Sequence, residues 1–170
     1  GTYLLAGASL CGGKAYALLE KFFRELVKEA TGQEKPLYKT LEKLAGDGKA
    51  SCTGRENRKK LQIETTFDGT RVHPEQTGSI TNLSTDNFTP AAFVYGTLEG
   101  MSRELYQMYQ TIQNGTGMQI KRMIGSGNGL RKNPVLCEIV EEMFGAKLAL
   151  AECEEEAATG AALSSMQQDE

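Results

Sequence analysis

The sequence has 170 residues, a net charge of −3 and 39% hydrophobic residues. Its length suits a single domain with a sizeable core, and its composition is that of a globular protein rather than a low-complexity or membrane protein. Because nothing supplies a basic stripe, we expect no nucleic-acid partner and no membrane. The densest basic run, Arg55–Lys60, also contains Glu56 and Asn57, so we expect it to be a solvated loop.

The cysteines carry no sign of a metal site or a disulfide framework. Cys11, Cys52, Cys137 and Cys153 lie far apart, and His73 is the only histidine. We therefore expect no zinc site and a reducing, cytoplasmic location. Leu4–Gly13 resembles the end of a lipoprotein signal but has no basic leader, and we expect no targeting signal. Because the sequence enters a predicted strand directly after Gly1, we expect it to be a piece of a longer protein.

The first part of the chain alternates short strands with amphipathic helices. Thr2–Leu5 is predicted to be a strand, and Lys14–Ala30 a helix with one apolar face. That face consists of Leu18, Leu19, Phe22, Phe23, Leu26 and Val27. A short helix is predicted at Leu37–Leu44, stopped by the glycines of Gly46–Gly48.

The middle of the chain contains a strand, a polar loop and a long helix. Leu61–Phe67 alternates as a strand and leads into the loop Phe67–Ile80. In that loop we expect His73 to be exposed, and Arg71 fits a structural ion pair as well as a phosphate contact. Thr89 before proline predicts a helix at residues 90–113. Its expected buried residues are Phe93, Leu98, Met101, Leu105, Met108 and Ile112.

The last part of the chain contains a glycine loop between a strand and a helix. Met118–Ile124 is predicted to be a strand, Gly125–Gly129 a loop, and Leu130–Phe144 a helix with apolar residues at three- and four-residue steps. The apolar positions of this helix are Val135, Leu136, Ile139, Val140 and Met143. A strand at Lys147–Leu150 follows, and then a helix at Glu154–Leu163. Because this helix has a smooth Ala/Gly face, we expect it to lie very close to a sheet.

The glycine loop has two interpretations. Free backbone N–H groups at the start of a helix suit a phosphate. Glycine-rich corners also occur between strands and helices without any ligand. Gly125–Gly129 lacks the Gly-Lys-Ser/Thr of a phosphate-loop NTPase and the glycine spacing of a dinucleotide fold, so both of those classes are disfavoured.

The same stretch carries a family resemblance. Gly125-Ser126-Gly127-Asn128, then Asn133-Pro134-Val135-Leu136, then the run from Glu155 to Leu163, resembles the carboxy-terminal part of the FGGY carbohydrate kinases. Gly-Ser-Gly-Asn is similar to the loop of the sedoheptulokinase-like members, whereas most of the family has Gly-Gly-Gly. Nearer the start, Gly7-Ala8-Ser9 is similar to the family's segment that lines the adenosine pocket, although Cys11 stands where glycerol kinases tend to have glutamine. Gly69–Pro74 resembles a family loop beside the interdomain cleft.

This resemblance implies a fold and a set of binding residues. The implied fold is α/β, a partial ribonuclease H-like (actin-like ATPase) domain whose long helices pack on a mixed sheet. Residues 1–170 would form the carboxy-terminal nucleotide-binding domain of a two-domain sugar kinase. The implied nucleotide-binding residues are Gly7, Cys11, Gly12, Gly127, Asn128 and Asn133. No catalytic residue and no metal ligand is expected in this chain, since the family's general base belongs to the other domain.

The implied chemistry is transfer of the ATP γ-phosphate to a hydroxyl of sedoheptulose or a related ketose or polyol, with Mg²⁺ bridging the phosphates. The implied partners are the sugar and the amino-terminal half of the same kinase. Whether the protein also forms a homodimer is left undecided by the resemblance. Two alternatives also stay open: a non-kinase nucleotide-binding module of the same superfold, and a scaffold domain that has lost nucleotide binding. An aspartate in the expected upstream motif would separate a kinase from either alternative.

Overall fold

The computed structural model describes residues 4–52, 60–152 and 156–166. It divides the chain into two units, Gly1–Met118 and Gln119–Glu170. The first unit contains helices α1 (Gly12–Thr31), α2 (Tyr38–Cys52) and α3 (Pro90–Thr116), and strands β1 (Gln62–Glu64) and β2 (Ser79–Thr81). The second unit contains strands β3 (Met123–Gly125) and β4 (Leu148–Leu150), and helices α4 (Asn128–Arg131), α5 (Pro134–Phe144) and α6 (Glu156–Met166).

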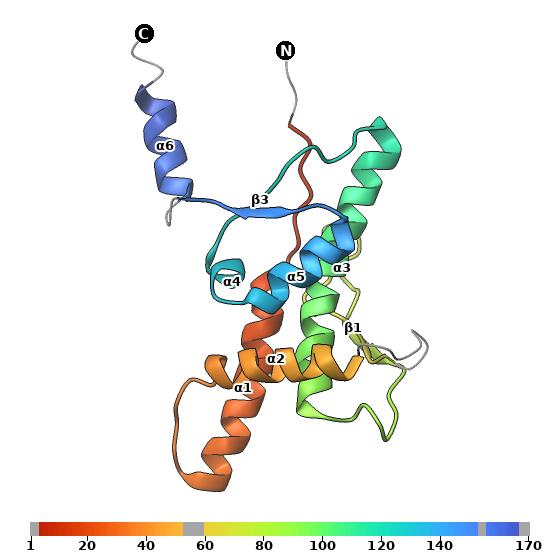
Figure 1. Cartoon of the computed structure of the whole chain (residues 1–170), viewed down its shortest axis with the longest axis vertical. Helices are drawn as coiled ribbons and strands as arrows, with labels where there is room; N and C mark the ends of the chain where they lie inside the picture. Colours follow the sequence, from red (N-terminus) through yellow and green to blue (C-terminus); the bar gives the residue numbers. More distant parts are fainter. Residues whose placement is uncertain (1–3, 53–59, 153–155, 167–170) are drawn as a thin grey trace. The chain divides into compact units, whose positions relative to one another are not determined.

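Helix α3 is the centre of the first unit. The Thr89 hydroxyl accepts a hydrogen bond from the Ala92 N–H (3.2 Å), so the predicted capping residue does begin this helix. Helices α1 and α2 and strand β1 all pack against α3, and α2 crosses it (Figure 1). The core of this unit includes Leu41, Leu61, Ile63, Val94 and Leu98.

The buried residues of α3 differ from those predicted, because three other elements pack around this helix. Of the six residues predicted to be buried, only Leu98 is fully buried, and Leu105 is 46% exposed. The first half of the helix instead buries nearly all its circumference, including Tyr95, Thr97, Ser102 and Glu104. The predicted set of buried residues was therefore largely wrong, because α1, α2 and β1 pack around α3 and bury polar positions of this helix as well as apolar ones.

Helix α2 runs further than predicted. Its expected stop at Gly46–Gly48 lies inside the helix, which ends at Cys52. A Cβ at Gly48 would lie 2.7 Å from Tyr95 Cβ and would also meet the Ala91 carbonyl of α3. Gly48 is therefore a contact position rather than a helix end, and the absence of its side chain lets α2 approach α3 closely.

Helix α1 agrees with its predicted range, but its apolar face is only partly covered. Leu18, Phe22 and Leu26 are 39%, 63% and 61% exposed. Its buried residues within the helix are Ala15 and Glu20. Glu20 is buried with partners, because it accepts hydrogen bonds from the Leu37 N–H (3.0 Å) and Arg24 Nε (3.3 Å).

The second unit contains a β-α-β arrangement. Strands β3 and β4 pair in parallel, with Met123 opposite Leu148, and α4 and α5 connect them. Leu136, Ile139 and Val140 are buried as the helical periodicity predicted. The predicted helix over residues 130–144 is in fact two helices, because Asn133 precedes a proline and caps the second of them.

The strands are shorter than predicted and do not form one mixed sheet. In the described part of the chain, β1 and β2 form an antiparallel pair in the first unit, and β3 and β4 a parallel pair in the second. Leu4 and Leu5 are not in a strand, while Thr2 and Tyr3 lie outside the described residues. Residues 55–59 of the predicted basic loop and Glu154 and Glu155 of the predicted closing helix also lie outside them.

Candidate nucleotide-binding site

Three of the predicted binding residues lie in the first unit, around the start of α1. The Ser9 hydroxyl accepts hydrogen bonds from the backbone N–H groups of Cys11 (3.3 Å) and Gly12 (2.9 Å). Ser9 thus satisfies the N–H groups of the N-cap residue Cys11 and of the first helical residue Gly12. A nucleotide at this segment would meet a preformed turn rather than a row of free amides.

The Cys11 side chain points into the protein. It is 2% exposed, and burial is the main cause that raises the pKa of its thiol, with the charges of Asp68 and Glu104 adding to the shift. The Phe67 backbone and Lys14 act in the opposite direction. A thiol with a raised pKa in a buried site is a poor nucleophile, so Cys11 can offer a ligand only its backbone.

The two glycines of this segment differ in their surroundings. A Cβ at Gly7 would lie 2.9 Å from Met108 Cβ, so Gly7 brings the backbone directly against α3. A Cβ at Gly12 would find only Ser9 Oγ nearby, at 3.9 Å. Gly7 is therefore fixed by packing, whereas Gly12 leaves open surface.

An ion pair connects the same helix start to the loop that follows β1. Lys14 Nζ lies 2.7 Å from Asp68 Oδ2, and this contact raises the pKa of Lys14.

The loop after Asp68 contains a tight turn. Gly69 has a positive φ of 72°, and the Thr70 N–H donates to the His73 carbonyl (2.9 Å). His73 is exposed, as predicted, and lies 3.3 Å from Glu75. The loop that resembles the family's cleft loop is thus attached to α1 by its first residues.

The other three predicted residues lie in the second unit, around the glycine loop. Gly127 has a φ of 92° and a ψ of 156°, and a Cβ there would meet no atom of the described residues within 4 Å. Its glycine is required by the backbone conformation rather than by packing. Asn128 is the first residue of α4, whose leading amides have no acceptor within the helix. Open space beside these amides suits a phosphate.

Asn133 has a structural role in the same unit. Its side chain is buried, at 5% exposure, and Asn133 Oδ1 accepts a hydrogen bond from the Leu136 N–H (3.1 Å). This cap begins α5. The six predicted residues therefore form two local sets, one in each unit.

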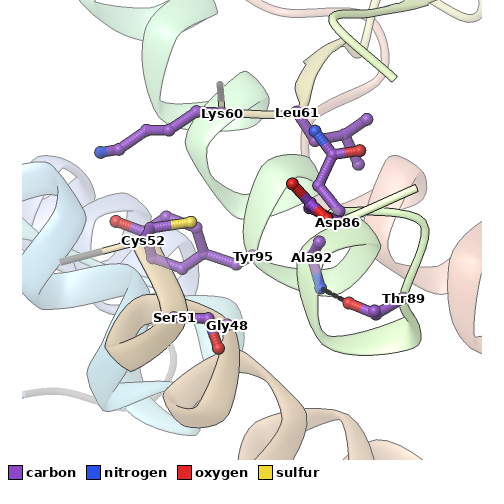
Figure 2. A pocket seen from close by; sticks show the side chains of 10 residues that line it. Gly48, Ser51, Cys52, Lys60, Leu61, Asp86, Thr89, Ala92 and Tyr95 are labelled. Atoms are coloured by element: carbon purple, nitrogen blue, oxygen red, sulfur yellow. Dashed lines mark hydrogen bonds between the residues drawn. The ribbon is translucent and has the colours of Figure 1, made fainter. Parts of the chain in front are cut away.

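A cavity in the first unit does not coincide with any of the six. It measures about 90 Å³ and lies where the end of α2 meets the start of α3 (Figure 2). Drug-sized ligands occupy pockets of about 300–1,000 Å³, so a nucleotide does not fit it. Its lining includes Gly48, Ser51, Cys52, Lys60, Asp86 and Tyr95.

Among the described residues, no group of three or more His, Cys, Asp or Glu side chains is arranged to hold a metal ion. None of the described helices is both long and apolar enough to cross a membrane.

Sequence reasoning missed one buried carboxylate near the first set. Glu104 of α3 is 8% exposed, and its Oε2 atom has no hydrogen-bond partner among the described residues. The sequence gives little signal for it: Gly96, Gly100 and Glu104 share one face of the helix, but a charged residue on a helix is usually solvated.

The fold and the glycine loop define the class of protein. The family model for the carboxy-terminal domain of the FGGY family of carbohydrate kinases matches residues 1–167. The chain belongs to this family, which confirms the resemblance seen in the sequence motifs.

Particular relatives are sedoheptulokinases. The chain is 28% identical over 172 residues to the mouse (Mus musculus) protein, covering 99% of this chain and 34% of the relative. It is 28% identical over 166 residues to the human (Homo sapiens) protein, covering 95% of this chain and 32% of the relative. The chain thus spans about a third of the length of the curated relatives it matches.

Solved kinases share the fold. A xylulose kinase from Rhodospirillum rubrum matches with a TM-score of 0.63 and 20% identity, over 81% of this chain and 25% of that one. A Plasmodium falciparum glycerol kinase with ADP matches with a TM-score of 0.60 and 17% identity, over 81% and 26%.

Proposed function

We propose that this chain is the nucleotide-binding part of an ATP-dependent carbohydrate kinase that phosphorylates a hydroxyl of sedoheptulose or a related ketose or polyol. The observation that carries the proposal is the open, positive-φ glycine at Gly127, at the start of a helix, in a member of the FGGY family. The names of its relatives, sedoheptulokinase among them, support the choice of substrate.

In this proposal residues 1–170 form the carboxy-terminal nucleotide-binding domain, with the partial actin-like ATPase fold. Gly127 and Asn128 offer backbone amides to the phosphates, and Gly7, Cys11 and Gly12 offer a backbone surface to the adenosine. Asn133 caps the start of α5, the helix that follows the glycine loop and α4. The loop fits a phosphate because no protein atom would contact a Cβ at Gly127.

Phosphoryl transfer requires charge neutralisation and a base in addition to this surface. Magnesium usually binds through the substrate phosphates and few carboxylates, so we propose Mg²⁺ as a cofactor carried by the nucleotide. The general base and most sugar contacts would come from the amino-terminal half of the same kinase, which we propose as the partner. We also propose a cytoplasmic location.

Nucleotide affinity tests the proposal. Gly127→Ala should weaken ATP binding about tenfold or more, because a methyl group would enter the space next to the amides. Gly145→Ala is a matched control, since Gly145 also has a positive φ (63°) and open surroundings but caps the end of α5. Titration calorimetry of both variants with Mg-ATP gives the answer. Equal affinity in the two variants would mean that the loop only makes a corner.

A turnover assay tests the proposal that the general base and the acceptor site belong to another domain. A coupled assay of this chain with sedoheptulose and Mg-ATP should stay at background, because a nucleotide surface without a base and an acceptor site cannot position an in-line attack. Robust turnover by the chain alone would contradict the assignment of the base to another domain.

A further inference from the structure

Helix α1 carries an apolar face that the first unit covers only at its start. Leu18, Phe22 and Leu26 follow the fully buried Ala15 at steps of three and four residues, so the four side chains share one face of the helix. Leu18, Phe22 and Leu26, here called the α1 face, are all exposed. In Figure 1 the second half of α1 extends past α2. The face that enters the core at Ala15 therefore continues outside it.

The chain covers the opposite side of the same helix. Glu20 accepts a hydrogen bond from the Leu37 N–H (3.0 Å). Arg24 and Lys28 both pair with Glu34, at 2.7 and 2.6 Å. The segment that follows α1 thus folds back along the polar side of the helix, and the α1 face is left exposed. A row of exposed apolar side chains on one helix is typical of an interaction surface.

The two edges of the α1 face differ in charge. Lys21 and Glu25 lie along one edge, where they contact each other at 3.7 Å, and Leu19 and Phe23 lie along the other. In a symmetric antiparallel helix pair each edge meets its own copy, so the charged edges meet and the apolar edges meet. A parallel pair would place the charged edge of one helix against the apolar edge of the other. The edges therefore favour an antiparallel pair of α1 helices.

The spacing along α1 also suits this pairing. When the two-fold axis passes beside Phe23, Lys21 lies directly opposite Glu25 of the second copy, because each is two residues from the axis. Leu26 then lies between Phe22 and Leu18 of the second copy, about 3 Å along the helix from each, at a rise of 1.5 Å per residue. The symmetry repeats both contacts. The α1 face is thus complementary to itself in its apolar and in its charged positions.

We propose that this protein forms a symmetric dimer in which the α1 faces of two copies pack antiparallel. The inference is independent of the proposed nucleotide-binding function. The exposed part of α1, from Leu18 to Thr31, is about 21 Å long at 1.5 Å per residue. A contact of this length lies at the low end of interface sizes, so the dimer dissociates on dilution.

A dilution series tests the dimer. In sedimentation equilibrium the mass of the chain should fall from twice the monomer mass toward the monomer mass as the concentration decreases. Phe22→Glu should raise the dissociation constant about tenfold or more, because it places a charge in the apolar contact. A chain that is monomeric at every concentration would overturn the inference.

Phe88→Glu is a matched control outside the α1 face. Phe88 and Phe22 are 64% and 63% exposed. Each ring also makes one edge-to-face contact at 5.5 Å, with Phe93 and Phe23 respectively. The two substitutions therefore add the same charge at similarly exposed rings, and Phe88→Glu should leave the dissociation constant unchanged. Equal effects of the two substitutions would overturn the assignment of the dimer to α1.

Charge exchange tests the antiparallel pairing. Lys21→Glu makes the charged edge acidic and Glu25→Lys makes it basic, so each variant alone should dimerise more weakly than wild type. An equal mixture of the two should associate at least about fivefold more tightly than either variant alone, since opposite charges then meet across the axis. The contact between Lys21 and Glu25 within one helix is lost in both variants, so mixing cannot restore it. A mixture no tighter than the single variants would overturn the antiparallel pairing.

The rest of the kinase is the other candidate to cover the α1 face, because the chain spans about a third of the length of its curated relatives. The longer kinase should dimerise as the chain does. Its Phe22→Glu variant should keep the wild-type melting temperature at a dilution where both are monomeric. A longer kinase that is monomeric at every concentration, and that Phe22→Glu destabilises, would assign the α1 face to the amino-terminal half and overturn the inference.

Discussion

The close approach of α2 to α3 depends on the missing side chain of Gly48. Leu41, Ala45 and Gly48 form the buried face of α2. Replacing Gly48 by alanine would place a methyl group 2.7 Å from Tyr95 Cβ and against the Ala91 carbonyl. Neither atom belongs to the end of a flexible side chain, so the two helices must move apart.

The change in stability caused by Gly48→Ala follows from two opposing effects. Overpacking of this kind costs about 1–3 kcal/mol, and we expect the upper half of that range because backbone atoms are involved. Alanine also has a helix propensity about 1 kcal/mol more favourable than glycine. The net loss for Gly48→Ala is therefore about 1–2 kcal/mol, which corresponds to a melting temperature lower by roughly 2–8 °C for a chain of this size.

Gly46 provides the control within the same helix. It is exposed, and a Cβ there would meet nothing within 4 Å, so Gly46→Ala should stabilise the chain by about 0.5–1 kcal/mol. Denaturant midpoints and thermal melts of the two variants should shift in opposite directions. Stabilisation by both substitutions would refute the close contact between α2 and α3.

Three further predictions concern the second unit. Glu141 accepts hydrogen bonds from the Leu148 N–H (2.8 Å) and from Lys147, which lower the pKa of its carboxyl below the ordinary value. Its stabilising contribution is therefore complete above the pKa of an unfolded glutamate, about 4.3, and is lost as the pH falls through the lower folded pKa. The stability difference between wild type and Glu141→Gln should shrink over that range in denaturant titrations, and a pH-independent difference would contradict this. Asn133→Ala should lower the denaturant midpoint by the equivalent of about 1 kcal/mol, because the cap of α5 is lost. Asn133→Asp should stay close to wild type, since aspartate also caps helices. Unchanged stability in the alanine variant would leave Asn133 only a ligand role. Gly160→Leu should not destabilise the chain, because a Cβ there meets no atom within 4 Å, whereas a loss of about 1–3 kcal/mol would mean a tightly packed helix.

The last of these reverses a prediction from the sequence. The Ala/Gly-rich closing helix was expected to lie very close to a sheet, but Gly160 has open surroundings and Leu163 is 58% exposed. A smooth face permits close packing without driving it, because alanine and glycine bury little apolar area. The Ala/Gly composition alone therefore could not predict whether this helix packs closely against a sheet.

Some local interactions were predictable from the sequence. The cap at Thr89 was predicted, because it involves a side chain and a backbone N–H only three residues later. The cap at Asn133 has the same local form but was not predicted, since residues 130–144 were expected to be one helix. The buried positions of α5 followed from periodicity because this short helix has one covered face.

Tertiary contacts were not predictable in the same way. Gly48 has the composition of a helix stop, and only its contact with α3 explains why α2 continues through it. The predicted strand over residues 61–67 ends early because the chain turns, with the Phe67 N–H donating to the Thr65 carbonyl (2.8 Å). In both cases the end of the helix or strand is set by a tertiary contact or a turn, and the pattern of apolar residues in the sequence does not show either.

The candidate site shows the same division between local and distant causes. Gly127 was singled out for a backbone conformation that glycine permits, and its φ of 92° is a property of the loop itself. Cys11 was singled out as a ligand contact, yet its side chain is buried in the folded protein. Glu104 looks like an ordinary surface glutamate in the sequence, since a charged residue on a helix is usually solvated. It loses water only because α3 is enclosed on several sides, so the sequence offered little means of finding this buried carboxylate.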